Sequence, residues 1–452
     1  MHCIINGQSG GANGAIIVSY TQDEHGGMIE EISFADDVPV VEPLTISGNP
    51  GTHTAPTGHS YNPVIVSEVP ERDVNFIDYD GRILYSYSAA DFANLSALPA
   101  NPTHEGLTAQ GWNWNLANAK THVATYGILD IGQSYTTTSG KTEVDIELTQ
   151  YHLDPYMSLG VNGTAVIDWG DGTATTTVTG SNIATAVTNQ HTYASGGKYT
   201  IKIQVSSGQA CLIGTSNNGF FHANNTSSRH RNKMYGIAVL SVRLGSGMSL
   251  GAYALCDFLK LQSVSIPTST TIGDHSFYYC KSLVAVVLPS GITSIGSHAC
   301  YGAESLLYFS IPNSVTNINT YMLGQAGISR ISLPGGITAI GDYTFTACEQ
   351  ITYLKLPASA TTIGNSALYS MYSLSCVVLP SSLTQIGNNV FNSDYALAEL
   401  HFTSATPPAA ASSSTFTGLP TTCIIYVPQG KLNAYKTATN YPSASTYTYV
   451  EE

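Results

Sequence analysis

The residues best suited to chemistry in this sequence are tyrosines and histidines that recur every 22 or 23 residues in its second half. They suit recognition, because they combine a large contact area with a polar end and because tyrosine faces can stack on sugars. Two columns are therefore candidates for ligand or receptor binding. The first column comprises Tyr253, His275, His298, Tyr321 and Tyr343, and the second comprises Tyr308, Arg330, Tyr353, Lys355, Glu399 and His401. The alternative is that they are ordinary surface residues of a Tyr-rich chain.

No catalytic motif in the sequence supports an enzymatic alternative to this interpretation. The sequence contains no G-x-x-x-x-G-K-[ST], no H-E-x-x-H and no dinucleotide-binding glycine pattern on a βαβ unit. Carboxylate pairs such as Asp36 with Asp37 and Asp78 with Asp80 lie in loop or turn contexts, where solvated acids and turn formers outnumber catalytic pairs. We therefore predict a non-enzymatic protein that has no catalytic residues, no cofactor and no metal site.

The net charge argues against one class of partner, and the cysteine spacing argues against disulfides and zinc sites. The 452 residues carry a formal net charge of -14, which opposes binding to a phosphate backbone, so nucleic acid is not an expected partner. The basic run at residues 229–233 is interpreted as a solvated loop. The eight cysteines are widely spaced without a C-x-x-C, and five lie in the recurring segment, which predicts buried thiols rather than disulfides or a zinc site.

The elements that must position the two columns are sequence repeats. An aliphatic residue followed by glycine recurs in step with a proline, and each unit reads approximately L-x-x-V-x-L-P-x-x-I-T-x-I-G-x-x-A-F-x-x-C. Aliphatic residues spaced by two precede each proline and should face a core, as in Val286 with Leu288 and in Leu354 with Leu356. The glycine suits a turn that needs an unusual backbone angle, and the small-aromatic pair after it, as in Ser276-Phe277, should fill the interior.

This unit resembles the BspA-like leucine-rich repeat over about residues 237–402, which implies stacked coils that form a β-solenoid. Residues 423–441 are similar to the C-terminal cap of such arrays. Asn319 stands in the glycine position of the fourth coil, which predicts an irregular coil there. At an inward position, Leu333→Ala should destabilise the protein by about 2 to 5 kcal/mol.

The first half of the chain resembles two small modules. Residues 166–205 resemble a PKD-type β-sandwich, with a tight turn at residues 168–172 and a last strand at 198–205. Residues 74–114 resemble the Listeria-Bacteroides repeat, a β-grasp-like module, and a helical segment at 115–126 is an addition to that pattern. Residues 51–70 are similar to short β-elements of phage structural proteins, and His53 and His59 there are interpreted as polar loop residues.

The expected fold is mainly β and multidomain. We expect an N-terminal Gly-rich attachment region at 1–72, a Listeria-Bacteroides-repeat-like β-grasp module at 73–137, a PKD-like β-sandwich at 138–208, a leucine-rich-repeat solenoid at 209–402 and a C-terminal cap at 403–452.

The resemblances imply a recognition protein. The first hypothesis is a phage tail fibre or tip protein of the virion, assembled in the host cytoplasm, in which residues 1–72 bind other virion proteins and the solenoid binds a host-surface glycan or protein. It rests on external-type modules together with the lack of a visible secretory signal. The sequence has no apolar run of about 18 residues, so membrane insertion is not expected. The alternatives are a BspA-like bacterial cell-surface adhesin and an accessory binding module of a cell-wall-active enzyme.

Overall fold

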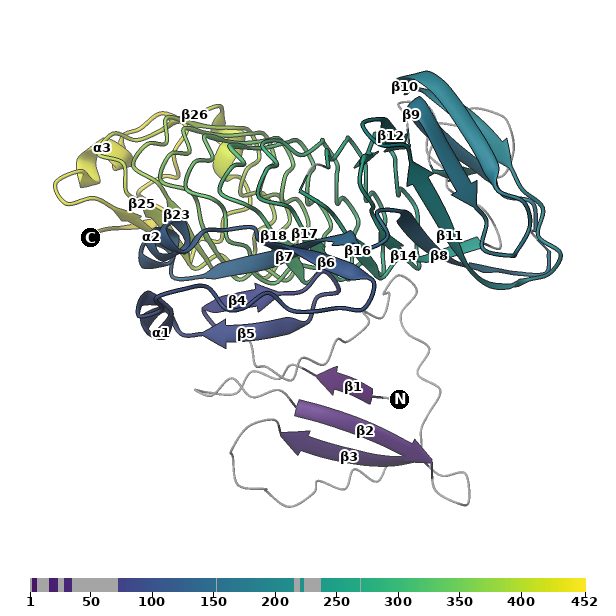
Figure 1. Cartoon of the computed structure of the whole chain (residues 1–452). Coiled ribbons are helices and arrows are strands. Elements are labelled where there is room, and N and C mark those ends of the chain that lie inside the picture. The colour runs from purple at the N-terminus through teal and green to yellow at the C-terminus, as the bar shows by residue number, and fades with distance from the viewer. Residues whose placement is uncertain are drawn as a thin grey trace.

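The computed structural model describes residues 2–5, 16–22, 28–34, 72–151, 153–214, 220–222, 237–268 and 270–452. Its mainly β architecture confirms the expected fold class: a solenoid with a larger, mostly antiparallel sheet at one end and a small α/β module along one side (Figure 1). Near the N-terminus, an antiparallel sheet has the order β1-β2-β3 and consists of β1 (His2–Ile5), β2 (Ile16–Gln22) and β3 (Met28–Phe34). The remaining residues of the predicted attachment region, and the basic run at 229–233, lie outside the described residues.

The small module spans residues 72–137 and combines a four-stranded sheet with two helices. The sheet has the order β5-β4-β7-β6, and its core comprises Val74, Phe76, Phe92, Trp114, Ala119, Val123, Leu129 and Ile131. Both helices begin at side-chain caps, because Ser88 and Asn115 accept hydrogen bonds from backbone amides of the first turn. The second helix confirms the predicted helical segment. The elements are β4 (Val74–Ile77), β5 (Ile83–Tyr87), α1 (Ala89–Ala93), β6 (Leu107–Trp112), α2 (Leu116–Tyr126) and β7 (Leu129–Thr137).

A nine-stranded sheet joins the module to the solenoid. Its main path runs β15-β12-β9-β11-β8-β14-β16, and β10 and β13 pair with β9. The predicted tight turn lies between β9 and β10, where Asp168 accepts a hydrogen bond from the Gly170 amide and Asp171 accepts one from the Thr173 amide. The strands are β8 (Thr142–Leu148), β9 (Tyr156–Asp168), β10 (Thr176–Gln190), β11 (Gly197–Val205), β12 (Ala210–Ile213), β13 (Phe221–His222), β14 (Ile237–Arg243), β15 (Met248–Leu250) and β16 (Ser263–Ser265).

The solenoid carries two columns of short parallel strands, which we call the first-strand and second-strand columns. The first-strand column continues from β16 through β17 (Ala285–Val287), β18 (Tyr308–Ser310), β21 (Tyr353–Lys355), β23 (Cys376–Leu379), β25 (Glu399–Phe402), β27 (Ile424–Val427) and β28 (Thr448–Glu451). The second-strand column contains β19 (Asn317–Ile318), β20 (Ala339–Ile340), β22 (Thr362–Ile363), β24 (Gln385–Ile386) and β26 (Ala409–Ala410). At the end of the rod, α3 (Leu432–Lys436) packs against β28, and η1 (Ser413–Phe416) places Phe416 against Phe391 and Tyr441.

The predicted inward residues are buried in every coil. Val286, Leu288, Leu354 and Leu356 are each at most 1% exposed, and Leu333 is 3% exposed. One continuous core runs from the nine-stranded sheet to the last coil, because a single coil cannot bury its own apolar face. The coil that contains Asn319 keeps both of its strands, β18 and β19, so the irregularity predicted there is not found. It lies in the following coil, where residues 331–333 form no strand between β18 and β21.

The repeated glycines have a different cause from the one the sequence suggested. Gly296 does not have a positive φ, and an added Cβ there would lie 2.2 Å from the carbonyl carbon of Gly273 in the preceding coil. These positions are glycine because the backbones of neighbouring coils approach closely. The unusual backbone angle occurs two residues later, for example at His298 with φ 58°.

We expect Gly296→Ala to lower the free energy of unfolding by about 1 to 3 kcal/mol, because the methyl group must push two coils apart. Gly336→Ala is the matched control, since a Cβ at Gly336 meets nothing within 4 Å and its φ is not positive. Urea denaturation of both variants measures the difference. Equal stability of the two variants would contradict this explanation of the repeated glycines.

Candidate functional site

The first-strand column is largely covered by the small module, which corrects the expectation that this column is a free binding face. Arg330 forms an ion pair with Asp130 of β7 at 2.8 Å and donates to the backbone carbonyl of Arg72 at 2.7 Å. The side chains of Arg330 and Asp130 are only 17% and 5% exposed. The sequence separates these two residues by 200 positions, so nothing local in it pointed to this contact.

Further contacts extend the covered surface along the coils. Asn113 donates to the Leu288 carbonyl at 2.9 Å, and Trp114 donates through its indole to the Ile311 carbonyl at 2.8 Å. His122 lies 2.6 Å from the hydroxyl of Ser332, and burial lowers the pKa of His122 to about 4. Because this imidazole is neutral at pH 7, the contact carries no charge.

The remaining first-strand candidates lie at the edge of the module or beyond it. Lys355 donates to the Thr125 carbonyl at 2.8 Å, so it also serves the intramolecular interface. Tyr308 is half-buried on β18, whereas Tyr353 is 45% exposed. Glu399 and His401 lie further along the column on β25, and His401 is within 3.4 Å of Glu399.

The other candidate column forms a continuous stack, which we call the aromatic ladder and define as Tyr253, His275, His298, Tyr321 and Tyr343. Successive ring centroids are 4.5, 4.5, 4.7 and 4.4 Å apart, with interplanar angles between 2° and 20°. This spacing follows from the fold, because neighbouring parallel strands are separated by about 4.8 Å, close to the distance between stacked rings. The structure thus brings together all five residues that the sequence placed in this column.

Three further tyrosines widen the ladder. Tyr278 and Tyr301 stack on each other with centroids 5.4 Å apart, and Tyr279 contacts the edge of both rings. Tyr278 also lies 5.2 Å from the ring of His275. Sequence reasoning missed these three residues, although their place three or four residues after a ladder position was a signal that could have identified them.

The ladder is built on an uncommon backbone conformation. All five residues have φ between 55° and 59°, a left-handed region in which glycine and asparagine are the usual residues. The last coils place Ser366 and Asn389 at the same position, with φ 52° and 54°. Bulky aromatic residues therefore occupy, in five successive coils, a backbone position that does not favour them.

Burial disfavours the charged form of several rings in and beside the ladder. Burial raises the pKa of Tyr278 to about 12 and raises the pKa values of Tyr301 and Tyr321. Burial also lowers the pKa of His298, against a smaller opposite effect of Asp274. His298 and Tyr321 therefore favour their uncharged forms, which suits a neutral ligand better than an ionic one.

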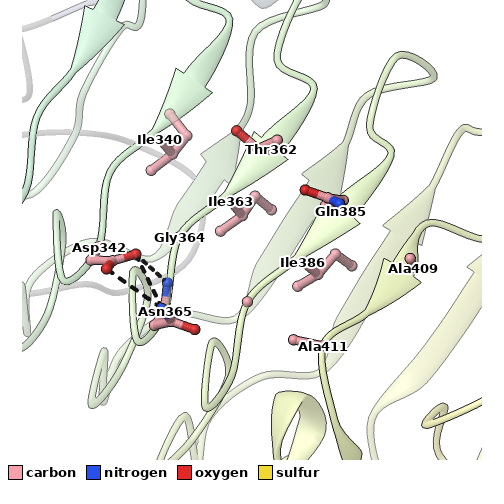
Figure 2. Close-up of a pocket in the computed structure, with 11 residues that line it drawn as sticks. Ile340, Asp342, Thr362, Ile363, Gly364, Asn365, Gln385, Ile386, Ala409 and Ala411 are labelled. Carbon is pink, nitrogen blue, oxygen red and sulfur yellow. Dashed lines mark hydrogen bonds between the residues drawn. The ribbon is translucent and has the colours of Figure 1, made fainter.

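A groove of about 510 Å³ follows the second-strand column beyond the ladder. Figure 2 shows Ile340, Ile363 and Ile386 along its strands, with polar side chains of Asp342, Thr362, Asn365 and Gln385 around them. Asp342 accepts a hydrogen bond from the Asn365 amide at 2.6 Å, and Asp342 directly precedes Tyr343 of the ladder. Figure 1 shows β26, which contributes Ala409 to the groove, on the edge of the solenoid opposite the small module.

The described cysteines mostly match their prediction. None of the seven forms a disulfide, and Cys211, Cys256, Cys280, Cys300, Cys348 and Cys423 are buried. Cys376 differs, since it is only partly buried on β23. No helix in the described part of the chain has both the length and the apolar character needed to cross a membrane.

Comparison with solved structures finds several leucine-rich-repeat proteins. The T. pallidum Leucine Rich Repeat protein is 25% identical, with 41% of this chain and 79% of that chain covered and a TM-score of 0.28. A leucine-rich repeat protein from Bacteroides ovatus is 17% identical, with 44% and 57% covered and a TM-score of 0.28. A leucine rich cell surface protein from Faecalibacterium prausnitzii is 13% identical, with 55% and 92% covered and a TM-score of 0.24. These TM-scores are too low for the likeness to support an argument about function.

The sequence match to a family is more specific. No curated protein matches the chain. Residues 242–328 and 316–425 match the family described as BspA type Leucine rich repeat region, in six copies. The matched residues include the second-strand column, the first-strand column as far as β25, the close-packed glycines and all five rings of the aromatic ladder. The solenoid of this chain is therefore built from leucine-rich repeats of the BspA type.

Proposed function

We propose that this chain is a binding protein that recognises neutral carbohydrate at a cell surface through the aromatic ladder and the adjoining groove. The observation that carries the proposal is the ladder itself: five stacked aromatic rings held on a left-handed backbone. Such strained positions are maintained where the surrounding structure over-determines them, and they cluster at functional sites. Leucine-rich repeats of this type are generally non-enzymatic binding modules, which agrees with the absence of the sought catalytic motifs from the sequence.

Polar groups beside the ladder support a carbohydrate ligand. Asp342, Asn365 and Gln385 provide carboxylate and amide groups at the groove, next to the terminal ring of Tyr343. Ligand sites combine apolar and aromatic walls with a few polar groups that fix orientation. A sugar has both an apolar ring face and hydroxyl groups, so it can use both kinds of surface at once.

The site of action is proposed to be a bacterial cell surface. The match to BspA-type repeats favours the adhesin interpretation over the virion interpretation, which depends on the sequence resemblances of the N-terminal half. A tail-fibre role and virion partners for residues 1–72 therefore stay predictions. Fractionation separates the two: we expect the chain in the envelope fraction of the producing bacterium, and its recovery in purified phage particles would favour the virion.

The binding test uses the full chain and immobilised oligosaccharides. We expect saturable binding to neutral glycans, with little change in affinity when acidic substituents are absent or when salt is raised, because stacking of a sugar on an aromatic face needs no ionic contact. Binding that requires acidic sugars and weakens steeply with salt would contradict the proposed site. Absence of binding to every glycan tested would contradict the ligand class.

A further inference from the structure

Three side chains with metal-binding chemistry meet near the C-terminal end of the first-strand column. Cys376 lies on β23, and Glu399 and His401 lie on β25; the parallel register places Cys376 beside Glu399. One ligand atom from each residue lies within 4.8 Å of the other two. Within the described residues, this is the one such group of three or more His, Cys, Asp or Glu side chains.

The imidazole of His401 is held in a defined orientation. Its Nε2 faces Glu399 at 3.4 Å, and its Nδ1 lies 2.9 Å from a carboxylate oxygen of Glu452. The ring also stacks on Tyr426, with centroids 4.3 Å apart and planes within 4°. Metal-ligating histidines commonly donate their second ring nitrogen to a carboxylate, and the Glu452–His401 contact has that geometry.

We propose that Cys376, Glu399 and His401 bind one Zn²⁺ ion and that Glu452 is a positioning residue that orients His401. The sulfur, nitrogen and oxygen donors suit zinc, whereas Ca²⁺ and Mg²⁺ prefer oxygen ligands alone. Zinc bond lengths place tetrahedral ligands about 3.5 Å apart, so the present atoms need only small rotamer changes to close on the ion. The fourth position is left to water.

The charges balance in this arrangement. Binding displaces the proton of the Cys376 thiol to solvent, and the resulting thiolate and the Glu399 carboxylate together neutralise the two charges of the ion. His401 binds as neutral imidazole through Nε2 and donates its Nδ1 proton to Glu452. No oxidant or reductant is needed.

Access to the cluster is open. The Glu399 and Glu452 side chains are 47% and 42% exposed, and Cys376 is partly buried, unlike the other six cysteines between residues 211 and 423. The bound ion would join β23 to β25 directly and, through Glu452, to the end of β28. It would thereby pin the terminal coils, where stacking stops and a solenoid otherwise frays.

The test is titration of the full, metal-free chain with Zn²⁺ and with Co²⁺ as a spectroscopic substitute. We expect one ion per chain, a sulfur-to-cobalt charge-transfer band, the intense visible bands of four-coordinate cobalt, and a rise in Tm with zinc. Cys376→Ser should remove the charge-transfer band, and His401→Ala should remove stoichiometric binding. Glu452→Gln should weaken binding by about 10-fold or more while retaining the sulfur band.

Glu349→Gln is the matched control, because Glu349 is an exposed solenoid carboxylate outside the cluster. This variant should bind zinc as tightly as the parent chain does. That result would show that zinc is coordinated by the cluster and is not merely attracted to a chain of net charge -14. Circular dichroism checks that each variant is folded. The proposal is overturned if the parent chain binds no stoichiometric ion, if cobalt binds without a sulfur band, or if Glu349→Gln weakens binding as much as His401→Ala does.

Discussion

Replacing Tyr321 and Tyr343 together by asparagine is expected to weaken glycan binding about 30-fold, with little change in stability. Each aromatic contact contributes on the order of 1 kcal/mol, and about 1.4 kcal/mol corresponds to a factor of ten. Asparagine tolerates the left-handed backbone, as Asn389 shows at the equivalent position with φ 54°. Titration calorimetry gives the affinity, and thermal unfolding shows whether the rod stays intact.

The control for the ladder variant is Tyr353→Asn. Tyr353 is 45% exposed on the first-strand column, outside the ladder, so we expect unchanged affinity when it is replaced. The opposite pattern, in which Tyr353→Asn weakens binding and the ladder variant does not, would assign recognition to the first-strand column. If neither variant changes the affinity for glycan, neither column takes part in glycan recognition.

Arg330→Ala is expected to destabilise the protein by about 3 to 5 kcal/mol and to loosen the small module from the solenoid. The change leaves the Asp130 carboxylate buried without its cation, and an uncompensated buried charge is strongly destabilising. The loss should be concentrated at the interface, so hydrogen exchange should rise along β7. Chemical denaturation of the whole chain gives the total decrease in the free energy of unfolding.

Lys355→Ala is the control for this interface. Lys355 makes one hydrogen bond to the module at an exposed edge, so its loss should cost less than about 1 kcal/mol. A small effect of Arg330→Ala, equal to that of Lys355→Ala, would mean that the ion pair does not hold the module. Retention of glycan binding by both variants would agree with a ligand site on the other side of the solenoid.

Much of the solenoid could be predicted from the sequence because its contacts repeat at a fixed spacing. Each coil packs on its neighbours 22 or 23 residues away, so the buried position of Leu354 is repeated at Val377 and again at Leu400. The ladder column followed from the same register. The cause of the repeated glycines did not follow, because a close approach between two backbones and a positive φ both select glycine and only coordinates distinguish them.

The two candidate binding columns show which features of this protein the sequence determined and which depended on tertiary packing. The sequence by itself determined the repeat, the inward residues and the alignment of Tyr253, His275, His298, Tyr321 and Tyr343, because these depend on local pattern and a constant period. Only the tertiary structure decided which column is open, since Arg330 meets Asp130 across 200 residues. It also brought Glu452 to His401 across 51 residues. Contacts at such separations depend on how whole modules pack, and no periodicity in the sequence encodes them.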